Sequence, residues 1–292
     1  MFRKILIANR GEIAVRIIRA ARELGITTVA VYSKADKEAL HTLLADEAVC
    51  IGPAKSTESY LNMNAVLSAA VLTGSEAIHP GFGFLSENSK FATMCEEVGI
   101  KFIGPSGAVM DLMGDKINAR AQMIKANVPV IPGSDGEVHT SDEALAIAEK
   151  IGYPVMLKAS AGGGGKGIRK VEKAEDLAAA FESASSEAKA AFGNGAMYME
   201  RVIYPARHIE VQILADQHGH VVHLGERDCS LQRNNQKVLE ESPSVAIGKT
   251  LRCQIGEAAV RAAQSVGYEN AGTIEFLFDE GKREFYFMEM NT

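Results

Sequence analysis

Residues 154–171 read PVMLKASAGGGGKGIRKV: an apolar strand, a run of glycines and a second short strand. The glycines match the string GxGxxG, but a dinucleotide-binding fingerprint needs a helix to begin inside the loop, whereas Ile168–Val171 has the pattern of a strand. A Walker A loop is excluded because Ser160 stands at its first glycine position and Gly167 follows the lysine. The stretch therefore predicts a hairpin flap whose backbone N–H groups can approach phosphate closely.

Lys158 lies on the strand that precedes this flap. From there it can reach the phosphates that the flap would cover, as in the glycine-rich hairpin of protein kinases. The alternative interpretation is a flexible surface turn with an ordinary exposed lysine. The glycines alone do not separate the two.

The last two apolar strands each contain one carboxylate. Glu275 interrupts the run 273–278 and Glu289 interrupts the run 285–291. With a turn near Lys282 the two glutamates face each other on antiparallel strands, and Asn291 shares the face of Glu289. Facing carboxylates in apolar surroundings repel unless a cation lies between them, and these oxygen ligands suit Mg²⁺. The alternative is that one glutamate points to solvent.

Two polar patterns remain open. His208, Glu210 and Gln212 alternate with apolar residues, as on the solvent face of an ordinary amphipathic strand. The run 225–237 is dense in polar side chains, and it can be a solvated loop or a site lined with hydrogen-bond donors.

The chain changes its pattern near residues 114–133. Before this point, β-rich runs alternate with a helix at Glu12–Leu24, which predicts a doubly wound parallel α/β domain. After it, strands occur in adjacent pairs, which predicts an antiparallel α+β arrangement in two lobes, the first ending near Arg201. The predicted strands are Lys4–Ala8, Thr27–Tyr32, Ala48–Ile51, Glu76–Ile78, Lys101–Ile103, Pro154–Ser160, Ile168–Val171, Ala196–Val202, His208–Ala215, His220–Gly225, Ala271–Asp279 and Arg283–Asn291.

Composition narrows the class of protein. A net charge of −6 gives no general attraction for nucleic acid, and no apolar run approaches the length of a membrane span. The four cysteines are far apart, which argues against a disulfide framework or zinc site and predicts a cytoplasmic protein. The apolar stretch after Met1 is too short for a signal peptide and is interpreted as a strand.

Five segments resemble the biotin carboxylase family, and they occur in the family's order from one end of the chain to the other. They are Ile7–Ala14, His79–Asn88, the flap at Gly162–Gly167, Glu226–Ser230 and Glu289–Thr292. The resemblance implies an α/β plus α+β architecture of the ATP-grasp type. It divides the chain into a pre-ATP-grasp domain with a doubly wound parallel sheet (1–115), a small lobe with linker and flap (116–203) and a large lobe (204–292) that would be incomplete.

The resemblance also implies an activity: ATP-dependent carboxylation of biotin with bicarbonate through carboxyphosphate. The segments are most similar to the biotin carboxylase subunit of bacterial acetyl-CoA carboxylase, which acts in fatty-acid synthesis. The implied cofactors are ATP and Mg²⁺, for which Mn²⁺ can substitute, with biotin as the carrier-bound substrate. The implied partners are biotin carboxyl carrier protein, the carboxyltransferase subunits and, at full length, a second copy of the chain.

Site residues follow from the same resemblance, position by position. Lys116 and Lys158 are expected at the ATP phosphates and Lys237 at bicarbonate. Glu275 and Glu289 are expected to hold Mg²⁺, with Asn291 at a second metal position. The other expected nucleotide contacts are Gly164, Gly165, Glu200, Arg201, Val202, Ile203, His208, Gln232 and Asn235.

The sequence departs from the family pattern in two ways. Asn234-Asn235 stands where members often have Arg-His, so Asn235 would replace a ribose-contacting histidine. The sequence stops at Thr292, before the family's Arg-x-Gln-Val-Glu-His motif, which carries a bicarbonate-binding arginine and a general-base glutamate. We therefore expect these 292 residues to bind Mg·ATP but not to carboxylate biotin.

Three alternatives stay open beside this interpretation. The chain could be the biotin carboxylase domain of a multidomain enzyme such as pyruvate carboxylase. It could be another ATP-grasp ligase, of carbamoyl-phosphate or purine metabolism, or a non-catalytic nucleotide-binding module. A Rossmann dehydrogenase is disfavoured by the hairpin context of the glycines.

Overall fold

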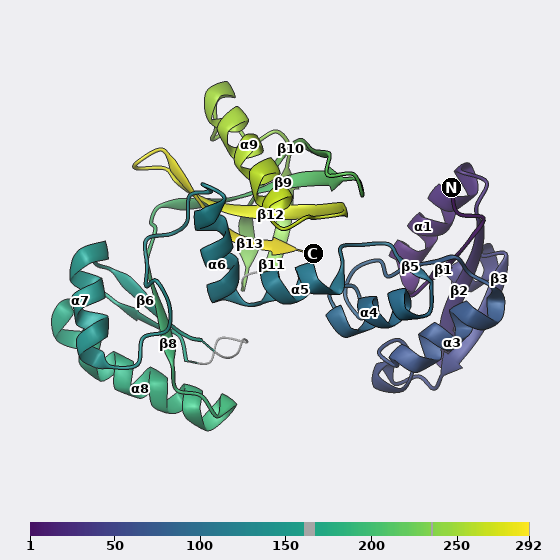
Figure 1. The fold of residues 1–292 in the computed structure, drawn as a ribbon, viewed down its shortest axis with the longest axis horizontal. Coiled ribbons are helices and arrows are strands. Elements are labelled where there is room, and N and C mark those ends of the chain that lie inside the picture. Colours follow the sequence, from purple (N-terminus) through teal and green to yellow (C-terminus); the bar gives the residue numbers. More distant parts are fainter. Residues whose placement is uncertain (161–166, 235, 292) are drawn as a thin grey trace.

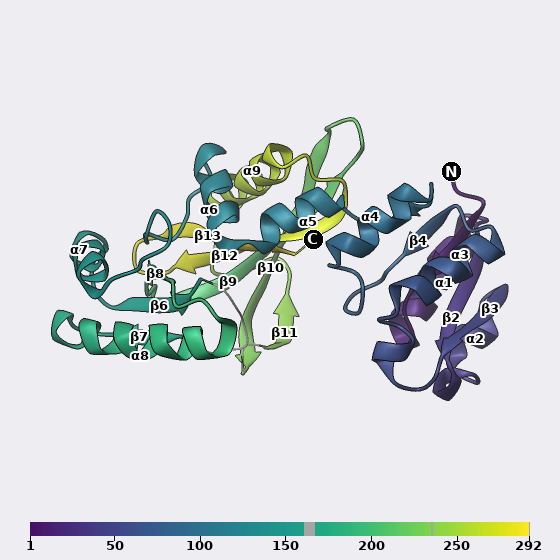
Figure 2. The ribbon, with the colours of Figure 1, turned by 60° about the horizontal axis from the view of Figure 1, so that its bottom comes forward.

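A computed structural model describes residues 1–160, 167–234 and 236–291. These residues form three sheets, one parallel and two antiparallel. The five-stranded antiparallel sheet lies between the parallel sheet on one side and the three-stranded sheet on the other (Figure 1). The same arrangement is visible in the rotated view of Figure 2. Among the described helices, none combines the length and apolar character that crossing a membrane requires.

The N-terminal sheet is parallel and has the strand order β3-β2-β1-β4-β5. Its strands are β1 (Lys4–Ile7), β2 (Thr27–Ser33), β3 (Glu47–Gly52), β4 (Ala77–His79) and β5 (Lys101–Phe102). Its helices are α1 (Gly11–Glu23), α2 (Leu40–Leu44), α3 (Met63–Thr73) and α4 (Ser89–Glu97), with 3₁₀ turns at Lys34–Asp36 and Ser56–Glu58. The predicted doubly wound domain is confirmed.

The polar contacts of Asn9 connect the ends of β1 and β4. The Asn9 amide donates to the carbonyls of Pro80 and Phe82, both at 2.7 Å. Parallel strands end at the same edge of a sheet, so one buried side chain can hold both loops. This anchor fixes the start of the segment that leads to Glu87, which lines the cavity described below.

The central sheet is antiparallel, with the order β11-β10-β9-β12-β13. Its strands are β9 (Ala206–Ala215), β10 (Val221–Arg233), β11 (Gln236–Glu241), β12 (Asn270–Asp279) and β13 (Glu284–Asn291). One face packs against α9 (Lys249–Ser265), and α5 (Gly107–Gly114) and α6 (Lys116–Lys125) join the same hydrophobic core. Helix α6 therefore packs on the central sheet, although its residues precede the small lobe in the chain.

The small sheet has the order β7-β6-β8, with β6 (Val155–Ala159), β7 (Arg169–Val171) and β8 (Met197–Arg201). It is covered by α7 (Ser141–Ile151) and α8 (Ala174–Phe192). Strands β6 and β7 pair antiparallel, which confirms the predicted hairpin on either side of the flap. At its far end Gly167 has φ +67°, and an added Cβ would lie 2.9 Å from that of Ala159, so glycine is required there.

Candidate functional site

The second face of the central sheet carries a row of charged residues. Arg227 pairs with Glu210 across β10 and β9, Glu210 pairs with Glu275 across β9 and β12, and Glu275 pairs with Glu289 across β12 and β13. These four residues therefore occupy one line across four strands. The predicted facing of Glu275 and Glu289 is confirmed.

Glu275 lies at the middle of this row and is 2% exposed. Its carboxylate is 2.5 Å from Nε2 of His208, 2.7 Å from Nζ of Lys237 and 2.6 Å from Nδ2 of Asn291. Burial by itself would raise the pKa of Glu275, but hydrogen bonds from His208 and Lys237 outweigh it and lower the pKa to about 2. Glu275 is therefore a buried anion that is already surrounded by donors.

Lys237 connects Glu275 with Glu210. Its ammonium group contacts both carboxylates, and Arg227 contacts Glu210 from the other side. Burial opposes the charge of Lys237, but the two carboxylates raise its pKa. An ammonium group has three protons, so one remains for a further acceptor such as an anionic substrate.

Strand pairing explains the polar run at 225–237. Residues 225–233 belong to β10, and Gln236 and Lys237 begin β11, which pairs antiparallel with β10, so the interpretation of the run as a loop was wrong. Gln232 is directed back to β9, where its Nε2 lies 2.9 Å from Nδ1 of His208. The alternating residues His208 and Glu210 likewise face this cluster and not bulk solvent.

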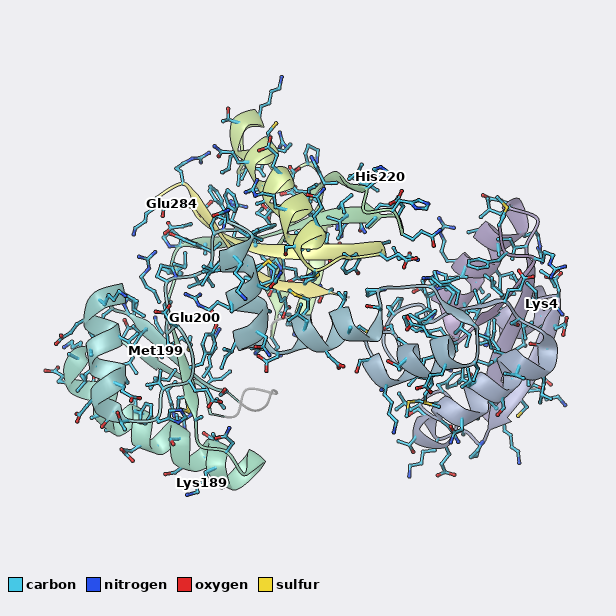
Figure 3. All side chains as sticks on the ribbon, viewed as in Figure 1. Lys4, Lys189, Met199, Glu200, His220 and Glu284 are labelled. Atoms are coloured by element: carbon cyan, nitrogen blue, oxygen red, sulfur yellow. The ribbon has the colours of Figure 1, made fainter. Side chains whose placement is uncertain are left out.

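A cavity of about 440 Å³ lies beside this cluster, between α6, β6, β8 and β13. Lys116 begins α6, Lys158 comes from β6 and Glu200 from β8, while Glu289 and Asn291 come from β13. Figure 3 places Glu200 on β8 near α6, at the junction of the small and central sheets. Asn291 also bonds Glu275, so the cavity and the charged cluster are continuous.

Lys158 and Glu200 are paired across the small sheet. Nζ of Lys158 lies 2.6 Å from the carboxylate of Glu200 and 5.7 Å from the ring centre of Tyr198. The Tyr198 hydroxyl donates to the same carboxylate. Lys158 is therefore held by an anion and an aromatic face.

The backbone after Glu200 is also fixed by hydrogen bonds. The N–H of Arg201 donates to Pro132 and the N–H of Val202 donates to Pro154, both at 2.8 Å. Backbone recognition of a base by these two residues would therefore use their carbonyl oxygens. Ile203 is buried with Ile131 and Tyr286. Among the described residues that line the cavity, Glu200 is present but Arg201, Val202 and Ile203 are not.

Three predicted contacts, Gly164, Gly165 and Asn235, lie outside the described residues. Apart from Arg201, Val202 and Ile203, which are in neither, the other predicted residues fall into two neighbouring groups. The cavity contains Lys116, Lys158, Glu200, Glu289 and Asn291, and the charged cluster contains His208, Gln232, Lys237 and Glu275.

The donor set fits a hard divalent cation. Glu275, Glu289 and Asn291 offer carboxylate and amide oxygens from two adjacent strands, the ligand type that Mg²⁺ prefers. Glu87 lies on the same side of the cavity, and partial burial together with the charge of Glu289 raises its pKa. A bound cation would relieve the repulsion between Glu87 and Glu289.

Four residues of the site were not assigned a role from the sequence. Glu87 falls in the His79–Asn88 segment but drew no separate attention, and Arg120 follows Lys116 by one helical turn. Glu210 and Arg227 were visible only as members of polar stretches. The spacing of Lys116 and Arg120 was the one readable signal, because residues four apart share a helix face.

A parallel α/β domain followed by two antiparallel sheets, with Lys158 and Glu200 of the small sheet and Glu289 of the central sheet around one cavity, defines an ATP-grasp protein. Two domain families match the chain: "Biotin carboxylase, N-terminal domain" at residues 1–110 and "Carbamoyl-phosphate synthase L chain, ATP binding domain" at residues 115–292. The chain belongs to the biotin carboxylase family.

Known relatives agree with this assignment. Biotin carboxylase 1 of Bacillus subtilis is 57% identical over 292 residues, which are 100% of this chain and 65% of the relative. The solved biotin carboxylase of Campylobacter jejuni, a complex with β-γ-ATP, is 53% identical with a TM-score of 0.91 over 100% of this chain and 65% of that one.

A third relative is the biotin carboxylase domain of Hydrogenobacter thermophilus 2-oxoglutarate carboxylase. It was solved as a dimer with MgADP, ADP and bicarbonate, and it is 52% identical with a TM-score of 0.88 over 100% of this chain and 64% of that one. The chain thus spans 64–65% of the length of each of these three proteins.

Proposed function

We propose that these residues form the ATP- and bicarbonate-binding part of an ATP-dependent biotin carboxylase. The proposal rests on the arrangement of cationic and anionic side chains at the cavity. Lys116, Lys158 and Glu289 line the cavity, and Asn291, which also lines it, bonds to Glu275 of the charged cluster that holds Lys237. Lysines suit phosphate oxygens, and a carboxylate pair suits the metal that accompanies them.

The proposed reaction begins with positioning. Lys116 and Lys158 would hold the phosphates of ATP, and Glu275, Glu289 and Asn291 would hold Mg²⁺. When bound, Mg²⁺ neutralises charge on the triphosphate. The third proton of Lys237 would hold bicarbonate so that one of its oxygens faces the γ-phosphorus.

The proposed reaction then proceeds in three steps. A bicarbonate oxygen attacks the γ-phosphorus and the bond to the ADP oxygen breaks, which gives ADP and carboxyphosphate. Carboxyphosphate releases CO₂ and phosphate. The ureido nitrogen of biotin passes its proton to the released phosphate and bonds to the CO₂ carbon, which gives carboxybiotin. Phosphoryl transfer of this kind depends mainly on alignment and on charge stabilisation.

Substrate and partners follow from the resemblance and from the relatives. We propose biotin on a biotin carboxyl carrier protein as the acceptor, and carboxyltransferase subunits as partners. The solved dimer with MgADP and bicarbonate supports bicarbonate as substrate and pairing of two copies. A cytoplasmic location is proposed from the free cysteines, which are widely spaced in the sequence.

The chain could belong to either of two carboxylases, which differ in the molecule that finally accepts the carboxyl group. Acetyl-CoA carboxylase in fatty-acid synthesis is our first proposal. A carboxylase of a 2-oxo acid is the second, favoured by the similarity to the 2-oxoglutarate carboxylase domain. For the 292 residues alone, the proposal covers Mg·ATP binding and does not cover turnover, because no residue assigned above removes the ureido proton.

Isotope transfer tests the proposed reaction on the natural protein. With ¹⁸O-labelled bicarbonate, ATP cleavage should place ¹⁸O in the released phosphate, because a bicarbonate oxygen attacks phosphorus. Lys237→Gln should reduce this transfer strongly while ATP still binds. Released phosphate that contains no ¹⁸O would show that water is the nucleophile and that the proposal is wrong.

A further inference from the structure

The proposed function requires Lys158 to exchange partners. In the described structure its ammonium group is bonded to Glu200 at 2.6 Å. Glu200 is buried, being only 8% exposed, and it faces the same cavity. If the phosphates of ATP attract Lys158, Glu200 keeps only the neutral hydroxyl of Tyr198 among the contacts described here. A buried carboxylate without a cation is strongly destabilised.

Arg120 is a further cation that lines this cavity. It follows Lys116 by four residues on α6, so both side chains extend from one helix face. One terminal nitrogen of its guanidinium donates to the carbonyl of Ile131, which packs with Ile203 beside the end of β8. The head group is thus anchored near Glu200.

The Nε–H group of Arg120 is a buried hydrogen-bond donor. Within the described part of the chain it has no acceptor. Buried donors are almost always paired in folded proteins, so this N–H group is available to a nearby acceptor such as the carboxylate of Glu200. Burial lowers the pKa of Arg120, while the charges of Glu200 and Asp135 oppose this effect. An arginine remains charged under such conditions.

We propose that Arg120 is a positioning residue that becomes the counter-ion of Glu200 when Lys158 moves to the phosphates of ATP. The inference rests on the proposed ATP site and adds a residue to it. Arg120 acts through Glu200 and does not contact the nucleotide. It makes the transfer of Lys158 less costly, and it keeps Glu200 and the neighbouring backbone of Arg201–Ile203 in place.

Two ligands, the nucleotide Mg·ATP and the nucleoside adenosine, separate this role from a structural one. Calorimetric titration of the 292-residue chain with Mg·ATP and with adenosine is the measurement. Arg120→Met should weaken Mg·ATP binding by about tenfold, the effect of losing one charge-assisted hydrogen bond. Adenosine has no phosphates to attract Lys158, so its affinity should change by less than about twofold on the same reasoning.

Further variants serve as controls. Arg120→Lys keeps the charge and should recover most of the affinity for Mg·ATP. Lys125→Met removes an exposed charge from the same helix and should leave both affinities unchanged. In the Glu200→Gln background, Arg120→Met should have no further effect, because the residue through which it acts is then neutral.

Several outcomes would overturn the inference. Normal Mg·ATP binding by Arg120→Met would do so, as would an equal loss for ATP and adenosine, which would indicate a structural role. An undiminished effect in the Glu200→Gln background would indicate direct contact with the nucleotide. If the unaltered chain binds no Mg·ATP at all, the proposed function fails as well, which distinguishes the two failures.

Discussion

Glu275 and Glu289 face each other across β12 and β13, but their side chains have opposite surroundings. Glu275 is buried beneath His208 and Lys237, whereas Glu289 is exposed at the cavity. One carboxylate is therefore fixed before any metal arrives, and the other is free to adjust. This asymmetry predicts different effects for the two substitutions.

Glu289→Gln should weaken Mg²⁺-dependent nucleotide binding by about tenfold or more and leave folding stability almost unchanged. Glu275→Gln should reduce both Mg²⁺-dependent nucleotide binding and folding stability, because it removes the anion that holds Lys237 and His208. Titration calorimetry with and without Mg²⁺, together with urea unfolding, checks both statements. Glu284→Gln, on β13 away from the cavity, is the matched control. Equal metal dependence in all three variants would mean that the pair is only structural.

Lys158→Ala should weaken Mg·ATP binding by about 10- to 100-fold, because a charge-assisted contact to phosphate is lost. Lys170→Ala is the control, since this lysine lies on the adjacent strand β7 and pairs with Glu172. Equilibrium titration of both variants gives the comparison. The assignment of Lys158 is contradicted if the two variants bind ATP equally well.

Asp36 should make the folding stability of the N-terminal domain depend on pH. Burial would raise the pKa of Asp36, but hydrogen bonds from Arg10, Tyr60 and Ser33 lower it from 3.8 to about 2. A lowered carboxyl pKa stabilises the folded state above the unfolded pKa, and this stability is lost as the pH falls through the folded pKa. Asp36→Asn should therefore cost about 2 kcal/mol at pH 7, and the difference from the unaltered chain should shrink between pH 4 and pH 2.

Hydrogen exchange of β2, which Asp36 supports through Ser33, measures this difference directly. The rates are compared at pH 7 and near pH 3. A difference between Asp36→Asn and the unaltered chain that stays constant over this range would rule out the titration of Asp36 as its cause.

Gly133 lies against the strand that carries Glu200. A Cβ at this position would be 2.4 Å from the carbonyl oxygen of Met199. Gly133→Ala should therefore displace β8, destabilise the chain by about 1–3 kcal/mol and weaken ATP binding. At Gly136 an added Cβ meets nothing within 4 Å, so Gly136→Ala is the control. Thermal unfolding and ATP titration of both variants should separate them, and identical behaviour would contradict the close approach.

Local patterns in the sequence predicted the elements that depend on neighbouring residues. Counting from a turn near Lys282 placed Glu275 opposite Glu289, and the glycine run predicted the hairpin of β6 and β7. The segment 225–237 was harder to interpret, because its polar side chains are paired across strands. Arg227 with Glu210, and Gln232 with His208, make a strand of a sequence that resembles a loop.

Long-range packing was not readable from the sequence. Helix α6 lies on the central sheet through residues such as Met123, and its apolar pattern does not say which sheet it covers. The same holds for the pairing of Lys158 with Glu200 across β6 and β8. The motifs predicted residues such as Lys158, Glu275 and Glu289, and the strand register determines which of them meet.

A Mg²⁺-dependent ATP site on this chain can be tested by a single titration. Mg·ATP is added to the folded 292-residue chain in a calorimeter, and the experiment is repeated with EDTA. We expect saturable binding of one nucleotide per chain, weakened when Mg²⁺ is removed. If a chain that is folded by circular dichroism binds no ATP, or binds it equally well without Mg²⁺, it has no such site.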